Sequence, residues 1–149
     1  MWRIRQATAD DAVHVRLIAR AAFLKYVPRM GCEPMPMSAD FAAAIALGRV
    51  VVIEASGSVG GCMIAWPETD AYFIDVVAVD PTRQGQGLGR QLFDHAASEA
   101  ERCGLHELRL YTNAAMTENL SMYARMGFVE THRATEQGHH RVYLRRTLG

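Results

Sequence analysis

The chain has 149 residues, of which 50% are hydrophobic and 21% are charged, and its formal net charge is zero. This length and composition predict a single folded domain over residues 1–149 and exclude a disordered chain. The balanced charge, with no run rich in lysine or arginine, argues against a nucleic-acid partner and against an anionic membrane surface.

Hydrophobic periodicity and turn residues predict elements in the order β-α-α-β-β-β-α-β-α-β-β. The expected strands are residues 2–7, 50–55, 59–66, 71–79, 105–112, 128–133 and 139–145, and the later expected helices are residues 88–102 and 118–126. Two shorter helices are expected after Thr8 and Ser38. This order predicts an α/β fold, in the α+β sense of a mixed sheet with helices on both faces.

Local signals set the bounds of the first helices. Thr8 followed by Asp11 is a capping-box pattern, which starts a helix. The apolar residues of that helix share one face: Val15, Ile18, Ala19, Ala22 and Phe23. The proline-rich residues 26–37 predict a loop, Ser38 predicts the cap of a short helix, and Gly48 predicts its end.

The three cysteines, Cys32, Cys62 and Cys103, are odd in number, lie far apart and form no CxxC or CxxH pair. They predict reduced thiols. No signal peptide precedes the first strand, and no apolar run is long enough to span a membrane. We therefore expect a soluble cytoplasmic protein.

A glycine-rich turn follows the apolar strand of residues 71–79 and leads into a helix. Glycines at positions 85, 87 and 89 allow positive φ and leave no Cβ in the way, so consecutive N–H groups can converge on phosphate oxygens. The helix N-terminus adds free amides and its positive dipole end. The turn predicts a pyrophosphate cradle. It does not fit a dinucleotide GxGxxG fingerprint, because Arg90 occupies the position of the third glycine. It also lacks the GK[ST] sequence of a Walker loop.

Gln84, Gly87 and Gly89 satisfy the pattern [Q/R]xxGx[G/A]. This pattern resembles motif A of the GCN5-related N-acetyltransferases, the GNAT superfamily, and the order of elements is similar to that of the family over nearly the whole chain. The resemblance implies a GNAT, or acyl-CoA N-acyltransferase, fold with a central mixed, mostly antiparallel sheet. It also implies acetyl-CoA as cofactor.

The resemblance further implies which residues bind the cofactor. The backbone of Val77, Ala78 and Val79 would pair with pantetheine, and the Val77 amide would face the thioester carbonyl. The loop would hold the pyrophosphate with residues that are consecutive in the chain: Gln84, Gly85, Gln86, Gly87, Leu88, Gly89 and Arg90.

A second stretch, NLSMYARMGF, resembles motif B of the family, commonly NxxAxxLYxxxGF. Tyr123, Gly127 and Phe128 match this motif. Met116 stands where the family often has asparagine, and Asn119 stands where it often has alanine. Asn119 is therefore expected to supply the cofactor contact from a different turn.

Two residues are candidates for proton transfer. By the resemblance, Tyr123 is the general acid that protonates the departing thiolate; the alternative is a tyrosine that packs beside Phe128. Alternate strand residues share a face, and of the two positions where relatives often carry a base, Phe73 and Asp75, only Asp75 can take a proton. A carboxylate in an apolar strand is costly to bury unless it faces a polar partner. Two alternatives to Asp75 as the base stay open: Asp75 forms an ordinary salt bridge, or ordered water removes the proton.

The proline-rich loop is expected to flank the acceptor site. Glu33 in this loop has three possible roles: it binds a cationic substrate, acts as an alternative base, or is a solvated loop charge. Tyr26 and Arg29 are likewise candidates for acceptor binding, with an ordinary loop role as the alternative. The pair His139 and His140 is not expected to bind a metal, because adjacent strand residues point to opposite faces and no third ligand is evident.

Together these patterns predict an acetyl-CoA-dependent N-acetyltransferase in which a primary amine attacks the thioester directly, without a metal. The acceptor is a small-molecule amine or a peptide amino group. A homodimer is implied by the resemblance, since dimers are frequent among relatives. Two other classes stay open: a non-catalytic acyl-CoA-binding regulatory module, and a different nucleotide- or phosphate-binding module.

Overall fold

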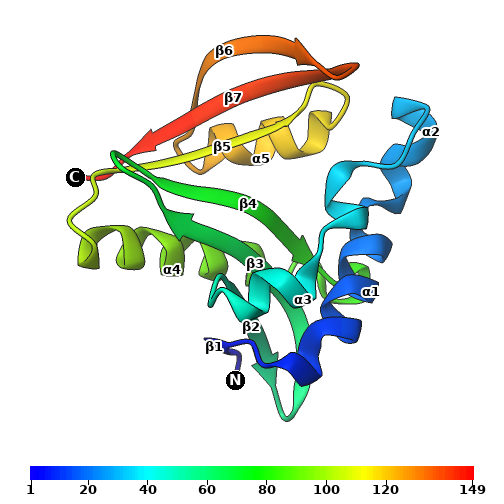
Figure 1. Cartoon of the computed structure of the whole chain (residues 1–149), viewed down its shortest axis with the longest axis vertical. Coiled ribbons are helices and arrows are strands. Elements are labelled where there is room, and N and C mark those ends of the chain that lie inside the picture. Colours follow the sequence, from blue (N-terminus) through cyan, green and yellow to red (C-terminus); the bar gives the residue numbers. More distant parts are fainter. The chain divides into compact units, whose positions relative to one another are not determined.

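Seven strands form one mixed sheet, flanked by helices, in the computed structural model, which describes all 149 residues (Figure 1). The strand order is β1-β2-β3-β4-β5-β7-β6. The pairs β1–β2, β2–β3, β5–β7 and β6–β7 are antiparallel, and β4–β5 is parallel. The expected mixed, mostly antiparallel sheet is confirmed. None of the helices is long and apolar enough to cross a membrane.

The elements agree closely with those expected. The strands are β1 (Arg3–Gln6), β2 (Val50–Ala55), β3 (Ser58–Pro67), β4 (Tyr72–Val79), β5 (Glu107–Asn113), β6 (Val129–Glu136) and β7 (His139–Thr147). The helices are α1 (Ala12–Phe23), α2 (Val27–Met30), α3 (Phe41–Ala46), α4 (Leu88–Arg102) and α5 (Thr117–Arg125). Short 3-10 turns cover residues 9–11, 24–26, 35–38 and 81–83.

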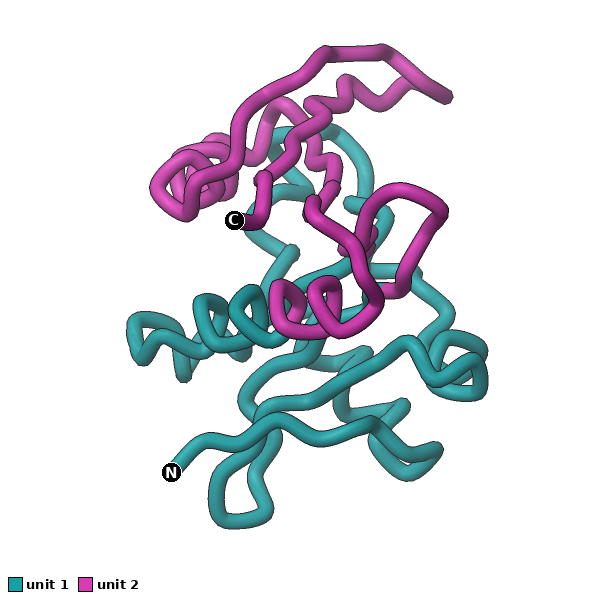
Figure 2. Tube along the Cα trace, turned by 90° about the vertical axis from the view of Figure 1, so that its left-hand side faces the viewer, with its two compact units in different colours: residues 1–65, 76–95 teal, residues 66–75, 96–149 magenta.

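The chain divides into two compact units, coloured teal and magenta in Figure 2. The first unit comprises residues 1–65 and 76–95, and the second comprises residues 66–75 and 96–149. The chain passes from one unit to the other inside β3, β4 and α4, not through separate linkers.

In the first unit, α1 buries the face that its apolar spacing predicts. Val15, Ile18, Ala19 and Phe23 are buried. The helix is preceded by a 3-10 turn, and the Asp11 carboxylate accepts the backbone N–H of Thr8 at 2.8 Å. This is the reciprocal half of the expected capping box, so the predicted start of the helix is confirmed.

The prediction that residues 26–37 form a loop without regular structure is wrong in part. Val27–Met30 make one turn of α-helix, with Pro28 in its first turn. Proline is tolerated there because the N–H groups of a first helical turn have no intrahelical partner. A second short turn, a 3-10 turn, covers residues 35–38.

Ser38 does not cap α3. The Ser38 hydroxyl donates to the carbonyl of Met35 at 3.2 Å, and Asp40 is the residue that caps the helix by accepting the N–H of Ala43 at 3.0 Å. Gly48, with φ of 72°, follows the helix as expected. Two residues with capping side chains compete for this position, and spacing alone does not separate them.

In the second unit, the strands separate an aliphatic face from a polar and aromatic one. Residues that alternate along β4, β5 and β7 are buried: Ile74, Leu108, Leu110, Val142 and Leu144. Their neighbours Phe73, Tyr111 and Tyr143 are only half-buried. β6 and β7 extend beyond the expected ends and meet at a tight turn through Gln137 and Gly138, both with positive φ.

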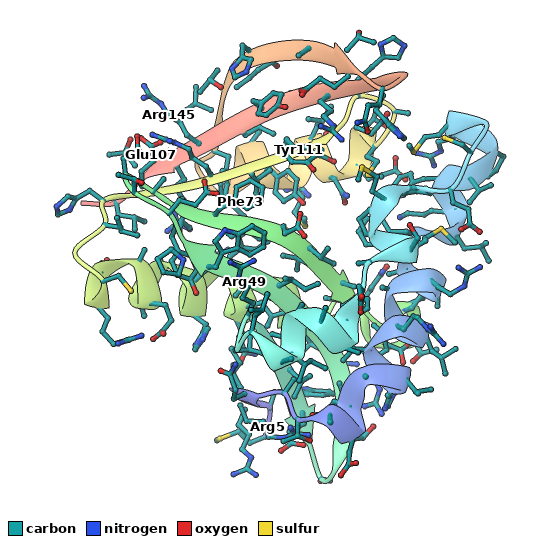
Figure 3. All side chains as sticks on the ribbon, viewed as in Figure 1. Arg5, Arg49, Phe73, Glu107, Tyr111 and Arg145 are labelled. Carbon is teal, nitrogen blue, oxygen red and sulfur yellow. The ribbon has the colours of Figure 1, made fainter.

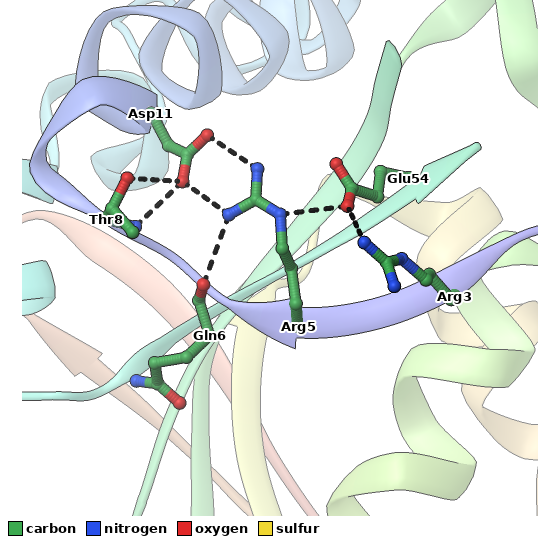
Figure 4. A network of polar contacts seen from close by, with 6 residues as sticks. All are labelled: Arg3, Arg5, Gln6, Thr8, Asp11 and Glu54. Atoms are coloured by element: carbon green, nitrogen blue, oxygen red, sulfur yellow. Dashed lines mark hydrogen bonds and ion pairs between the residues drawn. The ribbon is translucent and has the colours of Figure 1, made fainter. Parts of the chain in front are cut away.

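A network of charges fastens β1 in the first unit (Figure 4). Arg5 donates to both oxygens of Asp11, at 2.8 and 3.0 Å, and its Nε lies 3.0 Å from Glu54. Arg3 also pairs with Glu54, at 3.2 Å. The Arg5 hydrogen bonds lower the pKa of Asp11 from 3.8 to about 2 and lower the pKa of Glu54. The network joins β1 to β2 and to the turn that starts α1.

We expect Asp11→Asn to lower the free energy of unfolding by about 1–2 kcal/mol at pH 7, because the Asp11 carboxylate is nearly buried and bonded to Arg5. A carboxyl with a depressed pKa in the folded state stabilises fully above its unfolded pKa, and this contribution is lost as pH falls from about 4 to about 2. Urea unfolding between pH 7 and pH 3 measures the difference from the unsubstituted protein, which should shrink at the acid end. Asp10→Asn, at the exposed neighbouring position, is the matched control; an equal loss in both variants would contradict the role of the network.

Candidate active site

The side chains of β4 alternate between buried and accessible. Tyr72, Ile74, Val76 and Ala78 are buried, whereas Phe73, Asp75, Val77 and Val79 retain accessible surface. Asp75 is the exposed one among them. The predicted grouping of residues 73, 75 and 77 on one strand face is therefore confirmed. A carboxylate at Asp75 is not buried in the aliphatic core.

In the first unit, β3 and the end of β4 approach each other closely. A Cβ on Gly61 would lie 2.9 Å from the carbonyl oxygen of Ala78, and the N–H of Asp80 donates to the carbonyl of Gly60 at 2.8 Å. A Cβ on Gly60 would lie 2.7 Å from the ring of Trp2. Gly61 needs glycine for space because it would meet backbone, whereas a Cβ at Gly60 would have to displace the Trp2 side chain. Sequence reasoning treated this pair only as part of a strand, although a Gly-Gly doublet inside an apolar strand signals close backbone approach.

Cys62 continues this contact. Its thiol is fully buried and hydrogen-bonded to the backbone of Ala78, and burial raises its pKa to about 12. Such a thiol stays protonated and unreactive at neutral pH. Cys62 therefore packs β3 against the segment 77–79.

The turn after β4 is fixed at its start and open at its middle. Asp80 accepts the N–H and the hydroxyl of Thr82 at 2.9 and 2.8 Å, which closes the 3-10 turn of residues 81–83. Gly85 and Gly87 have φ of 85° and 79°, and a Cβ at either would meet no atom within 4 Å. The backbone of this stretch is exposed, and its two positive φ angles let successive N–H groups turn to one side.

Gly89 differs from the other two glycines of the turn. It lies in the first turn of α4, its φ is not positive, and a Cβ there would lie 3.9 Å from the side chain of Val79, an ordinary contact. The prediction that all three glycines provide positive φ is therefore wrong at Gly89. The reason is that the helix has already begun at Leu88, which is buried and holds the first turn.

The remaining predicted residues of the loop surround this backbone. Gln84 is exposed and its Nε2 lies 3.5 Å from the carbonyl oxygen of Val79. Gln86 and Arg90 are also exposed. Arg83, in contrast, bonds to Ser58 at 3.2 Å and covers the ring of Trp2. The first unit thus brings together the end of β4, the turn and the N-terminus of α4.

In the second unit, Tyr123 lies in the last turn of α5 on the buried side of the helix. It is 9% exposed, and its ring centroid lies 5.7 Å from that of Phe128. The N–H of Phe128 donates to the carbonyl of Tyr123 at 3.0 Å across Gly127, whose φ is 92°. Packing between Tyr123 and Phe128 fixes the position of the tyrosine ring, so the packing role foreseen for it is present whether or not its hydroxyl acts as an acid.

Asn119 stands at the start of α5 beside Met116. Its Nδ2 lies 3.7 Å from the Met116 sulfur, and the Thr112 hydroxyl lies 3.3 Å from the same sulfur. Met116 is buried and Asn119 is half-buried. Met116, which stands where the family often has asparagine, thus packs in the interior between β5 and α5.

Tyr111 on β5 lies near Asp75. Burial raises the pKa of Tyr111, the Arg141 cation lowers it, and the carboxylates of Asp75 and Glu136 raise it further. Asp75 thus belongs to a charged and aromatic surface of the second unit that includes Tyr111 and Arg141. This neighbourhood was not foreseen, because β5 and β7 residues were considered only as sheet.

The three residues predicted on the proline-rich loop have different environments within the first unit. Tyr26 is buried. Its ring centroid lies 6.2 Å from that of Phe23 and 5.3 Å from the Cζ atom of the Arg29 guanidinium. Glu33 is exposed and pairs with Arg20 at 3.3 Å. Tyr26 is therefore a packed residue that presents little surface.

The two adjacent histidines, His139 and His140, begin β7. His140 lies 3.0 Å from the Thr135 hydroxyl at the exposed end of the β6–β7 hairpin. No group of three or more His, Cys, Asp or Glu side chains is placed to hold a metal ion.

The comparison with protein families decides the affiliation. A family model described as "Acetyltransferase (GNAT) domain" matches residues 46–130, which is more than half of the chain and includes both the glycine turn and Tyr123. The chain belongs to the GNAT acetyltransferase family.

Relatives and solved structures agree with the GNAT affiliation. The chain is 31% identical over 84 residues to the IAA acetyltransferase of Azospirillum brasilense, covering 55% of each protein. It is 41% identical over 54 residues to the ribosomal protein bS18 alanine N-acetyltransferase of Escherichia coli K12, covering 36% of each. The matches thus span about half or less of these relatives' lengths.

The GNAT fold extends over the whole chain. The paia N-acetyltransferase of Thermoplasma acidophilum, solved in complex with coenzyme A, superimposes with a TM-score of 0.82 at 15% identity, over 99% of both chains. This likeness confirms the predicted fold class. The roles of individual GNAT residues in this chain stay predictions.

The two kinds of glycine in the turn give a matched test. We expect Gly87→Ala to lower the free energy of unfolding by about 1 kcal/mol, because an L-residue is strained at φ of 79°. We expect Gly89→Ala to leave it unchanged or raise it slightly, because Gly89 is helical and space for a Cβ exists. Urea unfolding followed by circular dichroism measures both. Equal destabilisation by the two substitutions would mean that the turn does not depend on positive φ at Gly87.

Proposed function

We propose that this protein is an acetyl-CoA-dependent N-acetyltransferase that acetylates a primary amine by direct attack of the amine on the thioester. The observation that carries the proposal is the exposed turn with positive φ at Gly85 and Gly87, which leads into the N-terminus of the 15-residue helix α4. Convergent N–H groups and the positive end of a helix dipole bind phosphate. The relatives' names support the same activity, since they are acetyltransferases.

The residues of the turn fit the pyrophosphate of acetyl-CoA. In this proposal the backbone of residues 84–90 binds the pyrophosphate, that of residues 77–79 binds pantetheine, and Asn119 adds a side-chain contact. Bound acetyl-CoA would supply the activated thioester. The N–H of Val77 donates a hydrogen bond to the thioester carbonyl oxygen, where negative charge develops during attack. The tight packing of Gly61 on Ala78 supports this assignment, because it holds the donor in one place.

Two side chains handle protons in the proposal. Tyr123 donates its hydroxyl proton to the sulfur as the thiolate leaves, and Asp75 accepts the proton that the attacking ammonium group loses. The exposure of Asp75 on its strand face supports access to an amine, and the packing of Tyr123 on Phe128 supports a fixed hydroxyl. Proton loss through ordered water is the alternative to Asp75.

The wider assignments extend this proposal. The acceptor is a small-molecule amine or a peptide amino group. Arg29 and Glu33 contribute to its binding, and the buried Tyr26 contributes indirectly, because its ring supports the Arg29 guanidinium. The enzyme works in the cytoplasm, which the free thiols of its three cysteines support, and forms a homodimer. Residues 1–149 act as one catalytic domain; support comes from the crossings between its units inside β3, β4 and α4, whereas domain boundaries usually fall in exposed linkers.

Calorimetric titration with acetyl-CoA, followed by a thiol-release assay over amines and peptides, tests the activity. We expect saturable binding and release of coenzyme A that depends on the amine. Binding without release across the panel would favour a regulatory acyl-CoA-binding module. Preference for ATP or NAD over acetyl-CoA would show that the turn serves another nucleotide and would overturn the proposal.

The role of Tyr123 has its own test. We expect Tyr123→Phe to lower kcat by about 100-fold, the scale of general acid catalysis, with the Kd of acetyl-CoA unchanged. Tyr72→Phe removes the same atom from a buried tyrosine on the opposite face of β4 from Asp75 and should leave kcat within about two-fold. Steady-state kinetics and calorimetry measure both quantities. Equal kcat values for the two variants would assign Tyr123 to packing alone.

A further inference from the structure

In the first unit, the Trp2 side chain packs on β3 at a position that has no side chain of its own. A Cβ on Gly60 would lie 2.7 and 2.8 Å from Cζ3 and Cη2 of the Trp2 ring. Gly60 lies at an irregularity in the pairing of β3 with β2, because the register steps from Gly61 to Val59. Glycine at such an irregularity often marks the close approach of another group. Here the group is the indole ring of Trp2.

The strand β1 holds Trp2 in this place. Its first residue, Arg3, pairs with Glu54 of β2 in the sheet. Arg3 and Arg5, the second of which is labelled in Figure 3, both form ion pairs with the Glu54 carboxylate. Trp2 directly precedes this paired segment and is half-buried. The indole ring therefore stands on backbone that the sheet has ordered, although it lies one residue from the first residue of the chain.

The guanidinium of Arg83 lies over the Trp2 ring. Its Cζ is 5.3 Å from the ring centroid, a distance typical of a cation–π contact. Its Nη2 also donates to the hydroxyl of Ser58 on β3 at 3.2 Å. Arg83 is the last residue of the 3-10 turn that leads into the exposed residues 84–87. Trp2 thus contacts the chain at the entry to the glycine turn.

The exit from the glycine turn meets the same position on β3. Leu88, the first residue of α4, is buried, and its Cδ1 would lie 3.0 Å from a Cβ on Gly60. The carbonyl of Gly60 also accepts the N–H of Asp80, ahead of the turn, at 2.8 Å. Between these ends, residues 84–87 are exposed, and neither of their two glycines has an atom within 4 Å of where a Cβ would stand. The order of this stretch therefore depends on its ends.

We infer that Trp2 and Arg83 are positioning residues for the pyrophosphate of coenzyme A: Trp2 braces the ends of the glycine turn, and Arg83 acts through Trp2 and not as a phosphate ligand. This inference rests on the proposed function. Backbone N–H groups bind an anion more tightly when they are ordered beforehand, because binding then does not have to order them. The contacts of the Arg83 guanidinium with Trp2 and Ser58 give it a place within the protein, on β3 and the indole ring.

Calorimetric titration with coenzyme A tests the pair. We expect Trp2→Leu and Arg83→Met each to raise the Kd about two- to five-fold, the range that an exposed cation–π contact represents. Because the two side chains act as one unit, the double variant should exceed the larger single effect by no more than about 1.5-fold. If the double variant shows the product of the two single effects, Arg83 contributes independently of Trp2, as a direct phosphate ligand would, and the inference is wrong.

Two further variants separate positioning from a general loss of stability. Trp2→Phe keeps an aromatic face and should hold the Kd within about two-fold of the unsubstituted value. Arg102→Met removes a guanidinium that pairs with Glu99 in the last turn of α4, and it should leave the Kd unchanged. At saturating acetyl-CoA, kcat of Trp2→Leu should also stay within about two-fold, because only binding depends on the brace. An equal rise in Kd for Trp2→Phe and Trp2→Leu, or a fall in kcat as large as the rise in Kd, would contradict the positioning role.

Amide hydrogen exchange without ligand distinguishes this inference from the proposed function. The N–H groups of Asp80 and Arg83 are bonded to the carbonyls of Gly60 and Asp80, and we expect Trp2→Leu to speed their exchange about three-fold or more. The Leu148 amide, bonded in the second unit, should not change. No coenzyme A binding by the unsubstituted protein would overturn the proposed function, while faster exchange would still show that Trp2 braces the turn. Normal binding together with exchange that Trp2→Leu leaves unchanged would overturn the inference and leave the transferase.

Discussion

The site depends on one steric constraint, the contact between β3 and the end of β4. A Cβ at Gly61 would stand 2.9 Å from the Ala78 carbonyl oxygen, so only glycine lets the two backbones come so near. The bond from the Asp80 N–H to the Gly60 carbonyl then fixes where β4 stops. From that point the Asp80 side chain closes a 3-10 turn, and the chain enters the glycine turn and α4. The point at which the glycine turn begins follows from this contact.

In the second unit, the rings of β4, β5 and β7 lie on the same side of the strands as the charges of Asp75, Arg109 and Arg141. The aliphatic side is buried. The other side carries rings and charges that interact with one another, as Arg141 does with Glu136 and with the face of Tyr111. Buried polar side-chain atoms without a hydrogen-bond partner are absent. Asp75 is tolerated in an apolar strand because it lies on the accessible side. The same period of two therefore determines both the stability of the core and the position of the candidate base.

Most elements could be predicted because their signals are local. The apolar face of α4, the period of β4 and the capping box at Thr8 each depend on neighbours within one or two turns. The errors arose where two local signals compete. Ser38 and Asp40 can both cap a helix, and the backbone chose Asp40. Pro28 signals a break but also suits a first helical turn. Gly89 belongs to the same glycine-rich stretch as Gly85 and Gly87, yet it lies within α4.

The sequence by itself determined the family, the order of the elements and the position of the glycine turn that is proposed to bind phosphate, because glycine spacing and hydrophobic period are properties of short stretches. The tertiary structure alone decided which backbone atom Gly61 approaches, the carbonyl oxygen of Ala78, and which rings of β5, β7 and β6 come into contact. Both arise from residues far apart in the chain, and the sequence carries no measure of which strands become neighbours. Tyr111, Tyr143 and His132 look like ordinary strand residues until pairing aligns β5, β7 and β6. Sheet register, set by backbone hydrogen bonds over the whole strand, is what turns them into one surface.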